Sequence, residues 1–162
     1  MKNLKAQAGR LGFLCQHRNL NYSILKLRIK KNEGFSSKPY KDQLGFYTVG
    51  FGHLILPNEK HLLKNQIKKS DLEKLFINDF NKALKNFNIY LKNFSSNKKD
   101  SELLIEMIFQ IGISGVLKFR KLLKNMNKKN KHLVCFEMME SLWYRQTPNR
   151  VKNLIRVYLK NE

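Results

Sequence analysis

Glu33, Asp42 and Thr48 are of residue types that could do chemistry together, and they lie in one short stretch with several glycines. Hydrolysis of a glycosidic bond needs one carboxylic acid to protonate the leaving oxygen and a second carboxylate on the other face of the sugar. In a poorly solvated pocket Glu33 would stay protonated to a higher pH, while a more exposed Asp42 would stay ionised. The Thr48 hydroxyl could then hold the attacking water. Two acids at this separation are common by chance, so spacing alone is weak support.

The surrounding sequence predicts a helix followed by a β-hairpin. Residues 23–31 carry apolar side chains at helical spacing, and Gly34 is a residue type that ends helices. Residues 40–51 predict a hairpin with a turn near Gly45, because aromatic or β-branched residues alternate with small ones on the return strand. A hairpin folded back on the end of the helix would place the two acids on opposite walls of a cleft.

The motif E-G-F followed by Y-K-D-x-x-G-F-Y-T-V-G-F-G-H, within residues 33–53, closely resembles the active-site segment of phage-type lysozymes, the muramidases of the T-even phage kind. Two further blocks, F-Q-I-G at 109–112 and W-Y-R-Q-T-P-N-R at 143–150, follow in the family's order. The resemblance covers about residues 25–159. It implies an α+β, mainly α, lysozyme-like fold. A long helix would join a small β-hairpin lobe to a larger helical lobe, with the active-site cleft between them.

The resemblance also implies what each member of the trio does. Glu33 would be the general acid, while Asp42 and Thr48 would position and activate the water. The implied reaction needs no metal or cofactor and hydrolyses the β-1,4 bond between N-acetylmuramic acid and N-acetylglucosamine in bacterial peptidoglycan. Inversion at the anomeric carbon is expected, which requires the wider carboxyl separation of about 6.5–9.5 Å. The implied role is that of an endolysin that lyses a bacterial host.

Substrate-contact positions are implied at Leu54, Phe109 and Gln110. A ring and an amide at the cleft floor would contact the sugar's apolar face and its acetamido group. For Leu54 and Phe109, simple packing is an equally good interpretation.

Supporting positions are implied at His53, Asp79 and Arg150. His53 is expected to pair with Asp79, to brace the hairpin and to favour its protonated form. Arg150 is expected to pair with Glu33, since a nearby cation limits the rise of that carboxyl's pKa.

Several positions depart from the residues usual in the family: Asn32, Leu44, Glu106, Leu122, Glu137 and Asn153. Asn32 and Asn153 replace an Asp and an Arg, so a charge pair is lost on both sides at once, which is gentler than losing one partner. Leu44 stands where an acid is common and Glu106 where Asn is common. Leu122 and Glu137 replace polar contacts of the opposite cleft wall. These changes leave substrate affinity and wall-chemistry preference open.

The remainder of the chain predicts a helical lobe. A long helix is expected to open at Ser70, with Glu73 completing a capping box, and to bridge the two lobes. The next helix is expected to be capped by Asp100 or Ser101 and to end at Gly112. Three further helices are predicted, at residues 115–126, 132–144 and 149–159.

Residues 1–22 are expected to form a basic, poorly ordered extension, and residues 23–162 a single lysozyme-like domain. Within that domain, the small lobe is expected at about 35–69, and the helical lobe at about 70–162 together with the first helix. The connector at 54–66 is shorter than in the family, which predicts that one cleft wall lacks a helix or loop. A monomer is expected.

The longest apolar run near the start, residues 11–15, is too short for a signal-peptide core or a transmembrane helix. Synthesis in the cytoplasm of a bacterial host is therefore expected, with access to the wall or periplasm through a holin or another route. Cys15 and Cys135 have neither metal-ligand nor CxxC spacing. In a reducing cytoplasm they are expected to be free thiols rather than a disulfide.

The chain carries 32 Lys and Arg against 12 Asp and Glu, a net charge of +20, which favours polyanionic partners. Anionic envelope polymers are the expected partners. AT-rich codons would also produce a Lys-rich chain. No recognised nucleic-acid motif is present, and the aromatic residues fall on core faces instead of interleaving with Lys, so no specific nucleic acid is expected.

Two rival functions stay open. A binding module of the same fold would keep the cleft and lack turnover, and the short connector and altered wall positions favour it. A basic nucleic-acid-binding protein would explain the charge, and its DNA binding would be sensitive to salt.

Overall fold

The computed structural model describes residues 22–42, 45–63 and 66–160. Predictions for residues 1–21, including Cys15, and for Leu44 lie outside the described residues. The helices and strands are α2 (Ser23–Glu33), β1 (Ser36–Lys41), β2 (Tyr47–Gly50), β3 (His53–Leu54), a 3₁₀ segment (Pro57–Leu63), α3 (Lys69–Asn86), a π-helical turn (Phe87–Leu91), a 3₁₀ turn (Lys92–Phe94), α4 (Lys98–Leu117), α5 (Arg120–Asn127), α6 (Lys131–Met139), α7 (Leu142–Gln146) and α8 (Pro148–Leu159). The α+β, mainly α fold class is confirmed.

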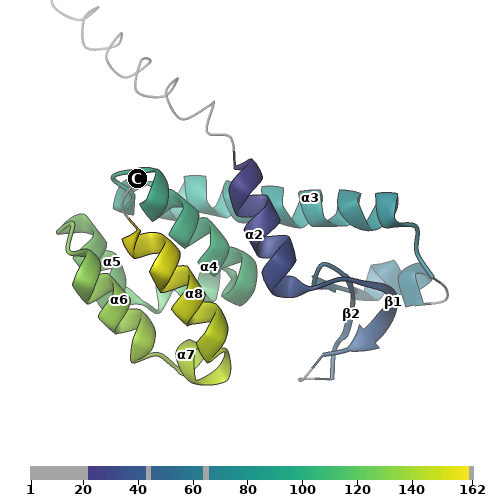
Figure 1. Ribbon diagram of the computed structural model, residues 1–162. Coiled ribbons are helices and arrows are strands. Elements are labelled where there is room, and N and C mark those ends of the chain that lie inside the picture. Colours follow the sequence, from purple (N-terminus) through teal and green to yellow (C-terminus); the bar gives the residue numbers. More distant parts are fainter. Residues whose placement is uncertain (1–21, 43–44, 64–65, 161–162) are drawn as a thin grey trace, which may run out of the picture.

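A small antiparallel sheet with strand order β1-β2-β3 forms one lobe, and the later helices gather into the other (Figure 1). The predicted hairpin is present as β1 and β2, with Tyr40 opposite Thr48 and Lys41 opposite Tyr47. The short strand β3 pairs with β2 and was not predicted. The sheet packs on α3, where the position of a Cβ on Gly50 would lie 3.1 Å from the Leu72 side chain.

Helix α3 runs behind α2 from the sheet to the helical lobe, as the predicted bridging helix should (Figure 1). Its predicted start is wrong in detail. The helix begins at Lys69 and has no side-chain cap, so Ser70 lies inside the first turn and forms no capping box. The 3.6-residue pattern then widens into the π-helical turn at Phe87–Leu91, whose two end residues are buried.

The predicted caps of α4 are also wrong. Asn97 is the capping residue, and its side-chain oxygen accepts a hydrogen bond of 2.9 Å from the backbone N–H of Asp100. Asp100 is buried in the first turn, where it accepts hydrogen bonds from Ser96 N and Tyr158 Oη, each 2.9 Å. The predicted break at Gly112 is confirmed, since this residue has a φ of +69°.

Two predicted helices are each divided in the structure. The segment 115–126 breaks at Phe119, whose ψ of 52° is not helical, so α5 starts at Arg120. The segment 132–144 breaks after α6, and the Ser141 side chain caps the short α7 by accepting from Tyr144 N at 3.1 Å. The last predicted helix is confirmed as α8.

The core is centred on α4, in which Leu104, Ile105 and Met107 have no exposed surface. Leu122 of α5 is also completely buried, so the apolar residue at this position offers no surface to the cleft. Tyr22, which the sequence analysis assigned to the extension, is buried against the Phe80 ring, 6.0 Å between centroids.

Within residues 22–42, 45–63 and 66–160, no helix is both long and apolar enough to cross a membrane. The same residues contain no group of three or more His, Cys, Asp or Glu side chains arranged to hold a metal ion. Cys135 is a buried free thiol, and burial raises its pKa to about 11.

Candidate active site

Glu33 is the last residue of α2, and its position follows from how that helix packs and ends. Leu25 and Ile29 anchor α2 in the core, with no exposed surface. Gly34 then ends the helix at a φ of 74°, which only glycine adopts readily. The chain after β2 returns to this point, because a Cβ on Gly52 would lie 3.0 Å from Glu33 Oε2. The Glu33 carboxyl is therefore held between a helix end and the backbone of the hairpin.

Arg150 of α8 holds the same carboxyl from the other side. Its Nη1 lies 3.1 Å from Glu33 Oε1, and its Nη2 donates a 2.6 Å hydrogen bond to the carbonyl oxygen of Asn32. The predicted pairing is thus present. Burial raises the pKa of Glu33 above its usual value, and the nearby Arg150 opposes this rise. The charge of Glu106 raises it further. Glu33 consequently stays protonated to a higher pH than an exposed glutamate.

Asp42 follows β1 directly, in the turn that closes the hairpin. Its Oδ1 accepts a hydrogen bond of 2.9 Å from Phe46 N, and its own N–H donates to Phe46 O at 2.9 Å. Gly45 N donates to the Asp42 carbonyl oxygen at 3.0 Å. These three bonds fix the direction in which the carboxylate leaves the turn.

Thr48 is buried in β2, and its hydroxyl donates a long hydrogen bond of 3.4 Å to Phe46 O. It lies directly opposite Tyr40, so these two side chains share a face of the sheet. Asp42 is two residues beyond Tyr40, and residues two apart in a strand point to the same side. The pairing therefore supports the predicted grouping of Thr48 with Asp42.

Tyr40 is a residue to which the sequence analysis gave no role. Its pKa is raised by burial, and further by the charges of Glu33 and Asp42. The phenol therefore lies within electrostatic reach of both acids. The sequence signal for Tyr40 is its spacing of two residues from Asp42, which puts both side chains on one side of a strand. This signal is weak, because an aromatic residue in a strand is usually explained by packing.

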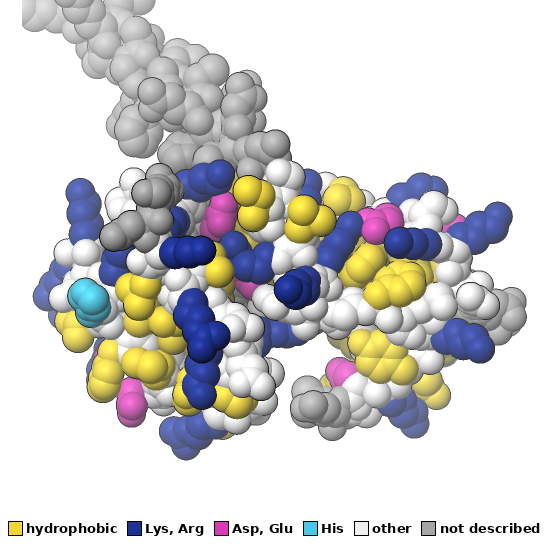
Figure 2. Space-filling view, in the orientation of Figure 1, with side chains coloured by type: hydrophobic (Ala, Val, Ile, Leu, Met, Phe, Trp, Pro, Cys, Tyr) yellow, Lys and Arg dark blue, Asp and Glu magenta, His cyan; other side chains and the backbone are white. Residues whose placement is uncertain are grey.

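A cavity of about 280 Å³ opens between β3 and the helices α3 and α4, and Gly52, Leu54 and Phe109 line it. Gly52 lines this cavity and also lies against the Glu33 carboxyl, so the acid is next to the cavity. Figure 2 shows a notch in the surface between the two lobes. Leu54 is 46% exposed, whereas Phe109 also packs on Phe76 with 5.6 Å between ring centroids. Phe109 therefore packs in the core and also lines the cavity, whereas the sequence left these two roles as alternatives.

Gln110 is not among the residues that line this cavity. Its Nε2 lies 3.5 Å from Glu106 Oε1, and its Oε1 is buried without a hydrogen-bond partner among the described residues. An unpaired buried carbonyl costs free energy. The predicted contact of Gln110 with substrate therefore has no support from this cavity.

His53 links the sheet to α3 as predicted, and it has a second partner that was not predicted. Its Nδ1 lies 2.6 Å from Asp79 Oδ2, and its Nε2 lies 3.1 Å from Glu59 Oε2. The hydrogen bond to Asp79 is the largest cause of a raised pKa at His53, although burial opposes it. Glu59 lies in the irregular connector, where no periodicity indicated its direction.

Two of the departures from the family pattern contact each other. Asn32 Nδ2 donates to Glu106 Oε1 at 3.1 Å. Asn153, expected to share the lost charge pair with Asn32, instead accepts from Arg156 at 3.2 Å. Both asparagines line a polar cavity of about 430 Å³ beside Arg150. Asn32 on α2 thus contacts Glu106 on α4. The family pattern has the reverse, with an acid at position 32 and an amide at position 106.

The chain matches one family of known proteins over most of its length. The family model described as phage lysozyme matches residues 30–157. The chain is similar to Probable T4-type lysozyme 2 of Dictyostelium discoideum, at 35% identity covering 84% of this chain and 94% of that protein. It is also similar to Probable T4-type lysozyme 1 of the same organism, at 34% identity over 83% and 93%. The Pre-baseplate central spike protein Gp5 of Enterobacteria phage T4 is 24% identical over 87% of this chain and 28% of its own length.

Proposed function

Because the chain belongs to the phage lysozyme family, we propose that it hydrolyses the β-1,4 bond between N-acetylmuramic acid and N-acetylglucosamine in bacterial peptidoglycan. The observation that carries this proposal is the state of Glu33. Its carboxyl lies beside the cleft, it is mostly buried, its pKa is raised, and Arg150 fixes its direction. A carboxylic acid held in this way can protonate a leaving oxygen at a higher pH than an exposed glutamate could.

In the proposed mechanism, Glu33 gives its proton to the glycosidic oxygen as the bond from that oxygen to the anomeric carbon breaks. A water molecule held by Asp42 and Thr48 attacks the anomeric carbon from the opposite face, and the Asp42 carboxylate takes the water's proton. The result is inversion, with one proton donated and one accepted. The hydrogen bond from Phe46 N to Asp42 Oδ1 holds the carboxylate in the direction that this role needs.

The cleft supports binding of an N-acetylated sugar. Leu54 and Phe109 offer apolar surface on either side of the cavity. A hydrogen bond from Gln110 to the acetamido group stays part of the proposal, and it requires the Gln110 side chain to turn, because its Oε1 is buried. His53, Asp79 and Arg150 would act through position, by bracing the hairpin and the acid.

The biological role proposed is digestion of a bacterial cell wall. Lysis of a bacterial host after synthesis in its cytoplasm is one setting. Two of the similar proteins come from Dictyostelium discoideum, so a phage infection is not the sole setting for a chain of this kind. The net charge of +20 would favour approach to anionic wall polymers.

The test is release of new reducing ends from purified peptidoglycan by the wild type, Glu33→Gln and Asp42→Asn. We expect activity in the wild type and a loss of about 100-fold or more in each variant. Turnover that survives Glu33→Gln would refute the assignment of the acid. Proton NMR of the product formed first from a soluble wall oligosaccharide reports the anomer, and retention would refute the inverting mechanism.

A binding module of the same fold is the second candidate, because the small lobe leaves apolar surface uncovered. A groove of about 620 Å³ on this lobe is lined largely by exposed apolar side chains. Phe46, Tyr47, Leu56 and Leu63 are 56%, 45%, 40% and 37% exposed. Binding of peptidoglycan by the wild type without release of reducing ends would establish this candidate.

A further inference from the structure

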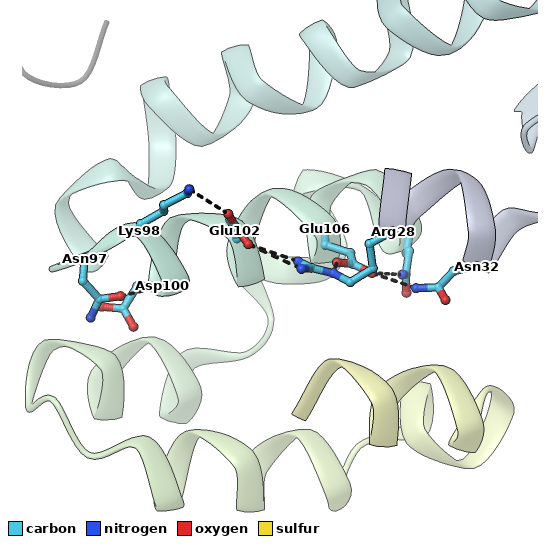
Figure 3. Close-up of polar contacts among 8 residues, drawn as sticks. Arg28, Asn32, Asn97, Lys98, Asp100, Glu102 and Glu106 are labelled. Carbon is cyan, nitrogen blue, oxygen red and sulfur yellow. Dashed lines mark hydrogen bonds and ion pairs between the residues drawn. The ribbon is translucent and has the colours of Figure 1, made fainter. Parts of the chain in front are cut away.

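Glu106 is a carboxylate with no exposed surface, located on α4 beneath the end of α2. A buried charge must be paired and hydrogen-bonded, or it destabilises the fold. Arg28 Nε lies 2.7 Å from Glu106 Oε2, and Asn32 Nδ2 donates to Oε1 at 3.1 Å. Figure 3 shows Arg28 and Asn32 reaching from α2 toward this carboxylate. Both oxygens of Glu106 are thus used to hold the last two turns of α2.

The residue next to Asn32 is Glu33, the proposed general acid. Asn32 is held from two sides, because its side chain donates to Glu106 and its carbonyl oxygen accepts from Arg150 at 2.6 Å. The same Arg150 contacts the Glu33 carboxyl at 3.1 Å. A continuous set of contacts therefore runs from the buried carboxylate on α4 to the acid in the cleft.

Three elements bring ionisable groups toward Glu33. Arg150 from α8 favours its ionised form and Glu106 from α4 opposes ionisation, while the charge of Glu33 in turn raises the pKa of the Tyr40 phenol on β1. Around Glu106, the charged neighbours are Arg28 on α2 and Glu102 one turn earlier on α4. Glu102 shares the Arg28 guanidinium at 3.4 Å and lies 3.9 Å from Lys98.

We propose that Glu106 is a positioning residue for the reaction. Its buried carboxylate fixes the last turn of α2 through Arg28 and Asn32, and it places a negative charge behind Glu33 that offsets Arg150. This inference rests on the proposed role of Glu33 as general acid. Arg150 alone would hold the acid in place and also promote loss of its proton. Burial is the larger cause that opposes this loss, and Glu106 adds to it while leaving the Arg150 contact in place.

The direct test is a titration of the Glu33 carboxyl by carbon-13 NMR, with the Glu33→Gln variant identifying its resonance. Glu106→Gln keeps the size of the side chain and an oxygen that accepts from Arg28 or Asn32, while it removes the charge. We expect the pKa of Glu33 to be lower in Glu106→Gln than in the wild type. Glu102→Gln is the matched control, because it removes a carboxylate from the same Arg28 without a contact to Asn32, and it should leave that pKa in place.

The second readout is the pH dependence of kcat/KM on peptidoglycan. Above the pKa of the acid, the rate falls about tenfold for each pH unit. We expect this fall to begin at lower pH in Glu106→Gln, whereas a merely structural loss would scale the whole profile down without moving it. Equal pKa values of Glu33 in the wild type and Glu106→Gln would overturn the inference.

Exchange of the acid and the amide keeps the test falsifiable if the single variant folds poorly. Asn32→Asp combined with Glu106→Gln leaves one carboxylate and one amide in the same contact. We expect this double variant to recover a raised pKa at Glu33, and a pKa as low as in Glu106→Gln would count against the proposed charge effect. The NMR titration needs no turnover. A chain that shows the expected pKa changes but no hydrolysis would refute the proposed function and leave the electrostatic role of Glu106 standing.

Discussion

Arg150 reaches from α8 to the end of α2, where its Nη1 lies 3.1 Å from the carboxyl of Glu33. Both side chains are largely buried, at 23% and 15% exposure. This contact joins α8, the last helix, to the final residue of α2, the first described helix. The ion pair orients the acid and, at the same time, works against the burial that raises its pKa.

Replacement of Arg150 by Met should therefore raise the pKa of Glu33 further and release its side chain. We expect the alkaline fall of activity to move to higher pH, while the maximal rate drops by about 10- to 100-fold through misplacement of the acid. The pH profile of kcat/KM checks both effects. Arg156→Met, at an exposed position of the same helix, should change neither one.

Gly52→Ala should disturb the acid directly. The new Cβ would lie 3.0 Å from Glu33 Oε2, at a residue with a φ of 80°. We expect a loss of stability of about 1–2 kcal/mol from the backbone and a drop in kcat/KM of about 10- to 100-fold from displacement of the carboxyl. Gly112→Ala has a similar φ of 69° and also lines the cavity, but its Cβ would meet no atom within 4 Å and would not touch Glu33. It should lose similar stability and retain more activity, so equal activity losses would contradict this explanation.

Glu33→Gln should stabilise the protein at neutral and alkaline pH. The folded-state pKa of Glu33 is raised, so the native state keeps a proton that the unfolded state releases, and stability falls as pH rises from the unfolded pKa through the folded one. Glutamine removes this loss. Thermal unfolding at several pH values should show a difference from the wild type that is small near pH 4 and grows above it. Glu140→Gln, at an exposed site, should show no such trend.

His53 should make the stability of the small lobe fall as pH rises, whereas a paired carboxylate makes stability fall as pH drops. Its folded pKa is raised above 6.5, so the stabilisation is fully present below that value and is lost as pH rises through the folded pKa. Glu59 has a lowered pKa, mainly because Leu56 N donates to it, so its contribution is lost as pH falls through that pKa. We expect His53→Gln to lower the melting temperature most between about pH 5 and 6.5. His132→Gln, at an exposed position, should have little effect.

Tyr158→Phe should destabilise the helical lobe without touching the cleft. The Tyr158 hydroxyl donates a 2.9 Å hydrogen bond to Asp100 Oδ1, and both residues are buried. Removal of the donor leaves a buried carboxylate oxygen without that partner, at a cost of about 1–3 kcal/mol. Urea unfolding measures this loss. Tyr90→Phe, at a position that is 54% exposed, should stay within about 0.5 kcal/mol of the wild type.

Local chemistry explains which elements could be predicted from the sequence. Gly34 and Gly112 end or break helices because glycine alone adopts their positive φ readily, and the signal is a single residue. The hairpin could be predicted for the same reason, since alternation and a turn glycine are local properties. The break at Phe119 carries no such signal, whereas the break at Glu140–Ser141 has only a weak one, the capping residue Ser141. Because serine also occurs within helices, neither break could be located from the local sequence alone.

In the candidate site, too, local sequence signals and tertiary contacts account for different features. The sequence by itself, through its motif, determined the family and the fold class, and it is the source of the proposed trio Glu33, Asp42 and Thr48. Only the tertiary structure decided that Glu59 joins His53 and that Glu106 contacts Asn32 and acts on Glu33. The physical reason is sequence distance. A buried charge is defined by its neighbours in space, and the partners of Glu106 on α2 lie more than 70 positions away along the chain.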